Sequence, residues 1–127
     1  MSKTFRDLSL EEKRKYIEVR KRLEEEEKKL LDIRYEKALN LAKEISEILY
    51  KKYKAKKVLL VGSLKDKELF TKWSDIDLAV SGISDKDYFK AISEVLSLST
   101  DFKIDIIDLD SCEEEIRLSL EREGILL

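Results

Sequence analysis

The stretch of residues 58–80 constrains the fold of this chain more than any other part of it. It opens with the continuous apolar run 58–61, whose length and branched residues favour a strand buried on both faces over a short helix. Gly62 and Ser63 end this run. Glycine lets a phosphate approach the backbone closely and the serine hydroxyl can add a hydrogen bond. A short helical turn is therefore expected at this point. A Gly-Ser pair by itself is more typical of a plain turn, and the Asp75-x-Asp77 motif that follows favours a turn that binds a phosphate.

Two acidic residues follow in the segment 75–80, which reads Asp-Ile-Asp-Leu-Ala-Val. Asp75 and Asp77 alternate with Ile76, Leu78 and Val80, and a strand has a side-chain period of two residues. Both carboxylates are therefore expected on one face of a strand, with the three aliphatic side chains in the core. Like charges side by side cost free energy unless they are solvated, protonated or joined by a cation. Aligned carboxylates are the ligands that a hard divalent ion such as Mg²⁺ selects.

A third acidic residue, Asp105, lies among aliphatic residues in the segment 103–109, which reads as another strand. If this strand lies beside the first acidic one, Asp105 can face the same ions as Asp75 and Asp77. Asp108 and Asp110 lie near the end of this strand, and they are interpreted as surface or capping residues rather than ligands.

The composition excludes several kinds of catalytic site. The chain has no histidine, so a Ser-His-Asp triad, a histidine general base and a histidine-ligated zinc site are impossible. Cys112, the single cysteine, is interpreted as a small buried or half-buried residue, because no histidine can activate it as a nucleophile. A lone cysteine allows no intrachain disulfide and favours a reducing, cytoplasmic compartment. No segment reads as a signal peptide or a membrane span, so no membrane partner is expected.

The net charge of −2 is unevenly distributed along the chain. Residues 1–57 contain 18 Lys and Arg against 12 Asp and Glu, whereas residues 58–127 contain 8 against 16. The first part is neither basic enough nor aromatic enough to predict a nucleic-acid binder. The acidic second part is typical of a site that binds metal ions.

Residues 10–53 are predicted to be helical, as one long helix or as two helices that meet near Leu31. Ser9 and Glu12 have the spacing of a capping box, and neither Gly nor Pro interrupts the region. An apolar face in its first part is interrupted at Glu26 and Glu27, so this part cannot bury itself fully in its own domain.

We therefore divide the chain into an N-terminal helical arm, residues 1–34, and a domain of residues 35–127. The arm is interpreted either as a surface offered to a partner, such as a second copy of this chain, or as a solvated helix held by salt bridges.

The order of predicted elements is helix, strand, turn, strand, helix, strand, helix. This order predicts an α/β (α+β) domain with a small mixed β-sheet flanked by helices and a long N-terminal helical extension. Trp73, just before the first acidic strand, is expected to pack under the preceding loop rather than against a base.

The combination of Gly62-Ser63, Asp75-x-Asp77 and a later Asp105 resembles the polymerase-beta-type nucleotidyltransferase superfamily. Within it, the segment SDIDLAV is similar to that of the minimal nucleotidyltransferases, the MNT family, often encoded as antitoxins beside a HEPN-domain partner. The resemblance covers residues 49–112 and implies the nucleotidyltransferase fold. Many minimal members have a second glycine shortly after the Gly-Ser pair, and this chain has none there.

The resemblance implies metal-dependent transfer of a nucleotidyl group from a nucleoside triphosphate, with ATP as the expected donor. Two Mg²⁺ ions, or Mn²⁺ in their place, would be the cofactors. The catalytic and metal-binding residues would be Asp75, Asp77 and Asp105.

The nucleotide would be held by residues before the acidic strand. Gly62 and Ser63 would hold its β- and γ-phosphates. Lys65, Lys67 or Lys72 would supply the positive charge that a triphosphate needs, with Lys65 as the candidate.

By resemblance, the acceptor would be a tyrosine hydroxyl on a HEPN-domain toxin, adenylylated by this chain as its antitoxin. An alternative is a catalytically weak or inactive protein of the same fold that neutralises or scaffolds a partner by binding alone. The altered Gly-Ser loop and the N-terminal arm favour this alternative. A third interpretation is a helical dimerisation module whose acidic residues are incidental.

Overall fold

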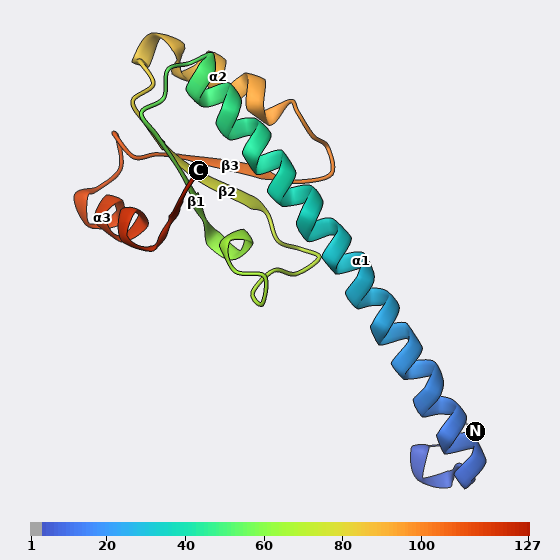
Figure 1. Ribbon diagram of the computed structural model, residues 1–127. Helices are drawn as coiled ribbons and strands as arrows, with labels where there is room; N and C mark the ends of the chain where they lie inside the picture. Colours follow the sequence, from blue (N-terminus) through green and yellow to red (C-terminus); the bar gives the residue numbers. More distant parts are fainter. Residues whose placement is uncertain (1–3) are drawn as a thin grey trace. The chain divides into compact units, whose positions relative to one another are not determined.

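The computed structural model describes residues 4–127, and it divides into a unit that ends at Ile33 and a second unit, Arg34–Leu127. One continuous helix contributes to both units (Figure 1). The elements in chain order are η1 (Phe5–Asp7), α1 (Leu10–Lys51), β1 (Lys57–Val61), η2 (Gly62–Lys65), β2 (Ile76–Ser81), α2 (Asp85–Leu96), β3 (Ile104–Asp108), α3 (Glu114–Glu123) and β4 (Ile125–Leu126).

Helix α1 is a single helix, which decides between the two possibilities that the sequence left open. The predicted capping box is present at its N-terminus. The backbone N–H of Glu12 donates to Ser9 Oγ at 3.1 Å, and the N–H of Ser9 donates to Glu12 Oε1 at 3.5 Å. These bonds satisfy N–H groups that lack partners in the first turn, so the helix begins where the pattern predicted.

The second unit contains a four-stranded sheet with the order β3-β2-β1-β4. Strands β1 and β2 are antiparallel, as are β1 and β4, whereas β2 and β3 are parallel. Helix α2 connects the two parallel strands, because a parallel pair needs a crossover rather than a hairpin. The predicted mixed α+β fold with a small mixed sheet is confirmed.

Both faces of this sheet are covered by helices. In Figure 1, α2 and the second half of α1 lie on one side of the sheet and α3 lies on the other. The alternating residues Ile76, Leu78 and Val80 are almost completely buried, as predicted for the core-facing side of β2. On the other face, Ala79 packs in a cluster with β1 residues, and Leu120 of α3 lies against it. Burying each large aliphatic side chain contributes roughly 1.5–3 kcal/mol, so these two layers hold β2 in place.

The end of the described chain is joined to the core by Tyr50 of α1. Its hydroxyl accepts a hydrogen bond from the backbone N–H of Val58 at 2.8 Å and donates to the carbonyl of Leu127 at 3.0 Å. The N–H of Leu127 in turn donates to the carbonyl of Val58 at 2.9 Å. One phenol therefore links the helix, the first residues of β1 and the strand β4 beside it. No helix in residues 4–127 is long and apolar enough to cross a membrane.

Candidate active site

Asp77 and Asp105 lie directly opposite each other on the parallel strands β2 and β3. Their neighbours Ile76 and Ile104 form the preceding pair in the same register, and both are buried on the opposite face. Adjacent strands are roughly 4.8 Å apart, so this register brings two carboxylates of like charge next to each other. Both residues are half-buried. They lie on the same face of the sheet as Ala79, which is the face that α3 covers.

Burial and the neighbouring carboxylates raise the pKa of Asp77 above its ordinary value. Burial makes the largest contribution, and the negative charges of Asp105 and Asp75 raise the pKa further. Lys103 acts in the opposite direction, and its Nζ lies 3.8 Å from Asp105 Oδ2. The amine does not outweigh the two carboxylates at Asp77. The site therefore has unbalanced negative charge that a bound cation would relieve.

Asp75 lies one residue before the strand rather than in it, contrary to the prediction. The ladder of β2 begins at Ile76, whose N–H donates to the carbonyl of Lys103 at 2.9 Å. The chain ahead of it is held in a turn by a hydrogen bond from the N–H of Ser74 to the carbonyl of Thr71, at 3.0 Å. Asp75 is half-buried and close enough to raise the pKa of Asp77. It therefore belongs to the site, although not through strand alternation.

Gly62 allows the end of β1 to pass directly beside the Asp77 carboxylate. Its φ of +72° is in the region that favours glycine, and it begins the predicted helical turn η2. A Cβ at this position would overlap Asp77 Oδ2 and would lie 3.2 Å from both Cβ and Cγ of Asp77. Gly62 therefore leaves room for the carboxylate in its present position.

Ser63 is joined to the segment before β2 through a residue that sequence reasoning missed. Ser63 Oγ donates to Ser74 Oγ at 2.9 Å, and Ser74 Oγ also accepts from the N–H of Thr71 at 2.8 Å. These bonds connect the Gly-Ser turn to the residue immediately before Asp75. The only signal in the sequence was a small polar residue beside the acidic motif, which is too common to assign a role.

The three candidate lysines each contact a different group. Lys65 Nζ donates to the carbonyl of Glu123 at the end of α3, at 3.2 Å. Lys67 Nζ lies 5.6 Å from the centre of the Tyr35 ring, and Lys72 Nζ lies 5.2 Å from that of Trp73. An ammonium group has three N–H donors, so this contact alone does not prevent Lys65 from contacting a phosphate.

Trp73 does not pack under the loop, so that prediction is wrong. Its side chain is 80% exposed, whereas Phe70 in the same loop is buried against Tyr35, with ring centres 5.2 Å apart. The loop is thus anchored by Phe70, which leaves Trp73 in solvent two residues before Asp75.

Cys112 is half-buried, as interpreted from the sequence, and its Sγ donates to the carbonyl of Leu109 at 3.5 Å. Asp108 and Asp110 also have the capping roles expected of them. Asp110 Oδ2 accepts from the N–H of Gly82 at 2.8 Å, and Asp108 Oδ1 accepts from the N–H of Asp110 at 3.0 Å.

The carboxylates of the site fit a hard divalent cation whose coordination is completed by the substrate and water. Within residues 4–127, no three acidic or cysteine side chains converge closely enough to hold a metal ion by themselves. Mg²⁺ is usually bound by one or two carboxylates together with substrate phosphates and water, rather than by a cage of protein ligands. Asp77 and Asp105 supply such a pair, and burial together with the charge of Asp105 raises the pKa of Asp77.

Residues 43–127 match the family described as "Polymerase beta, Nucleotidyltransferase". The chain belongs to this nucleotidyltransferase family. A search of curated proteins found no significant match.

The nucleotidyltransferase match contains the whole site. Its range begins in the second half of α1 and covers the four strands, with Gly62, Asp75, Asp77 and Asp105 inside it. Membership supports nucleotidyl transfer as the general reaction, and members of the superfamily typically use divalent metal ions. The first unit, up to Ile33, lies outside the matched residues.

Proposed function

We propose that this protein transfers AMP from ATP to a tyrosine hydroxyl of a HEPN-domain toxin and so acts as its antitoxin. The observation that carries the proposal is the pairing of Asp77 with Asp105 beside Gly62, within the residues that match the nucleotidyltransferase family. The finer assignment of toxin and tyrosine rests on the similarity of the SDIDLAV segment to minimal nucleotidyltransferases.

In this mechanism, Asp77 and Asp105 hold the divalent cation, with Asp75 beside them. Bound Mg²⁺ supplies positive charge that binds the triphosphate and stabilises the charge of the transition state. Gly62 leaves room for the Asp77 carboxylate, and the Ser63 hydroxyl turns from Ser74 to donate to a phosphate oxygen.

The transfer itself is an in-line displacement at the α-phosphorus. The tyrosine oxygen forms a bond to this phosphorus, the bond to the bridging oxygen breaks, and pyrophosphate leaves with its electron pair. The hydroxyl proton passes to the Asp105 carboxylate, whose side chain is 46% exposed and therefore accessible to an acceptor.

The test uses ATP labelled at the α-phosphate together with a purified HEPN-domain toxin encoded beside this protein. We expect Mg²⁺-dependent label on the toxin, and its loss when the acceptor tyrosine is replaced by Phe or when Asp77 is replaced by Asn. Label that persists in Asp77→Asn would refute the assigned mechanism. Absence of label with the unaltered protein would refute protein adenylylation.

A second candidate function is partner binding without catalysis. Two observations favour it: Lys65 is bound to the Glu123 carbonyl, and the loop before Asp75 lacks the second glycine common in minimal members. This function predicts that Asp77→Asn still neutralises the toxin fully in a growth assay. Adenylylation predicts that the same variant fails to protect.

A further inference from the structure

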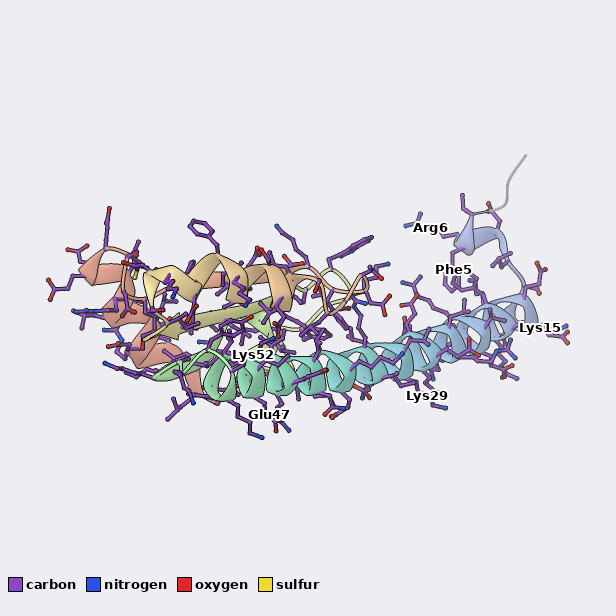
Figure 2. All side chains as sticks on the ribbon, turned by 90° about the horizontal axis from the view of Figure 1, so that it is seen from above. Phe5, Arg6, Lys15, Lys29, Glu47 and Lys52 are labelled. Atoms are coloured by element: carbon purple, nitrogen blue, oxygen red, sulfur yellow. The ribbon has the colours of Figure 1, made fainter. Side chains whose placement is uncertain are left out.

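The unit that ends at Ile33 presents an apolar helix face that no other part of its described residues, 4–33, covers completely. Tyr16, Val19, Leu23 and Leu30 of α1 are all exposed, and each lies three, four or seven residues from the next. Figure 2 shows this part of α1 between the labelled Lys15 and Lys29, with Phe5 of η1 turned toward the helix. The Phe5 and Tyr16 rings lie 5.5 Å apart, so η1 extends the apolar surface at one end.

This face carries a groove with charges arranged symmetrically along it. The groove has a volume of about 370 Å³ and is lined by Tyr16, Val19, Arg20, Leu23, Glu24 and Glu27. At about 100° per residue, Arg20, Leu23 and Glu27 follow one line along the helix. Arg20 and Glu27 lie at equal distances from the midpoint between Leu23 and Glu24, and they carry opposite charges.

We propose that this groove is the interface at which two copies of the chain pair through antiparallel α1 helices, with the two-fold axis near Leu23. This axis places Arg20 of each copy opposite Glu27 of the other. It also brings Leu23 against its symmetry mate and Leu30 to Tyr16. Glu27, one of the two acidic residues that interrupt the apolar stripe, thereby gains a basic partner in the second copy.

The charges in the groove fit the antiparallel direction and oppose the parallel one. In the antiparallel pair, Arg20 of each copy faces Glu27 of the other, so opposite charges meet at both ends of the groove. Parallel pairing in register would instead place residues 24–27 of both copies together, which like-charge repulsion disfavours. Residues 10–33 contain 8 basic and 8 acidic residues, so two such segments approach without net repulsion.

Arg20 is free to change its partner on association. It contacts Glu24 at 3.3 Å and the Tyr16 hydroxyl at 3.4 Å, within a solvent-exposed pair. Exposed helix pairs of this kind contribute little to stability, so exchanging Glu24 for Glu27 of another copy costs little. The intrahelical contact holds the guanidinium over the groove before pairing.

The test is sedimentation equilibrium of the full chain over a range of loading concentrations. We expect a reversible dimer whose dissociation constant rises at least tenfold in Leu23→Asp, in Arg20→Glu and in Glu27→Arg. The double variant Arg20→Glu/Glu27→Arg should recover most of the affinity, because its charges are exchanged but still opposite across the axis.

Glu25→Arg provides the matched control, since this residue lies on the far side of the helix from the groove. It should leave the dissociation constant within about twofold, and circular dichroism should show an unchanged helix content in every variant. A chain that stays monomeric at all concentrations would overturn the proposal and leave this face for a different partner. A double variant no better than its single variants would overturn the antiparallel arrangement.

Discussion

Asp77 is the residue at which stability and function oppose each other. Its carboxylate is half-buried, paired with Asp105 and raised in pKa, which are unfavourable conditions for a negative charge. The fold retains it on the central strand β2, and Gly62 leaves room beside it for the charged group. Such a cost at a specific carboxylate is what a cation-binding site requires.

We predict that Asp77→Asn stabilises the protein at neutral pH when no divalent cation is present. Because the pKa of Asp77 is raised on folding, its contribution to stability is complete below the ordinary Asp pKa and is lost as pH rises through the raised value. The variant has no proton to lose at this position and gains no charge, so the two proteins should be equally stable in acid and diverge toward neutral pH. Thermal unfolding in a chelating buffer measures this difference. A variant less stable than the natural protein at pH 7 would contradict the assignment.

Gly62→Ala should reduce nucleotidyl transfer by about 100-fold, because the added Cβ displaces the Asp77 carboxylate and misplacing a catalytic group by about 1 Å has an effect of this size. The matched control is Gly82→Ala, since Gly82 has a φ of +88° and lies beyond the opposite end of β2. Both variants incur backbone strain of roughly 1–2 kcal/mol or more. Only Gly62→Ala should lose activity at a temperature at which both are folded. Equal activity in the two variants would remove Gly62 from the site.

At the scale of elements, the strands were predictable wherever the signal was local. A continuous apolar run predicted β1, and alternation predicted β2, because burial of one or both faces leaves a direct pattern in the sequence. The pairing of Asp77 with Asp105 followed from assuming that their strands were neighbours, which the sheet order confirms.

Elements set by distant contacts were not predictable. Strand β4 has two exposed residues, so no burial pattern marks it in the sequence. It forms a strand because it pairs with the edge of β1. Lys65 binds a carbonyl at the end of α3, and Trp73 is exposed because Phe70 takes the buried position in their loop. Neither outcome leaves a periodic signal in the sequence. Each depends on contacts with residues that are distant in the chain, Glu123 for Lys65 and Tyr35 for Phe70.

The contact between α1, β1 and β4 predicts the effect of Tyr50→Phe. Removing the hydroxyl leaves the backbone N–H of Val58 without its acceptor in a buried strand, which costs roughly 1–3 kcal/mol. Urea unfolding should show this loss. Tyr16→Phe removes only an exposed hydroxyl and should change the free energy of unfolding by less than about 0.5 kcal/mol. Equal effects of the two substitutions would show that Tyr50 does not join these elements.

At the scale of the whole molecule, the two units contain different features. The second unit contains the family match from residue 43 onward and all of the candidate catalytic residues. The first unit contains the groove centred on Leu23 and no part of the matched segment. The proposed catalysis and the proposed self-association therefore belong to separate parts of the chain, and we expect variants in one to leave the other unchanged.

The central claim, that Asp77 and Asp105 form a cation-dependent nucleotide site, is tested most directly by calorimetric titration with ATP. The titration is made with and without Mg²⁺, on the natural protein and on Asp77→Asn. We predict binding that requires Mg²⁺ and weakens by about 100-fold or more in the variant, since the cation loses one of its two paired carboxylates. Binding of equal strength in both proteins, or no binding of Mg²⁺ and ATP to the natural protein, would contradict the claim.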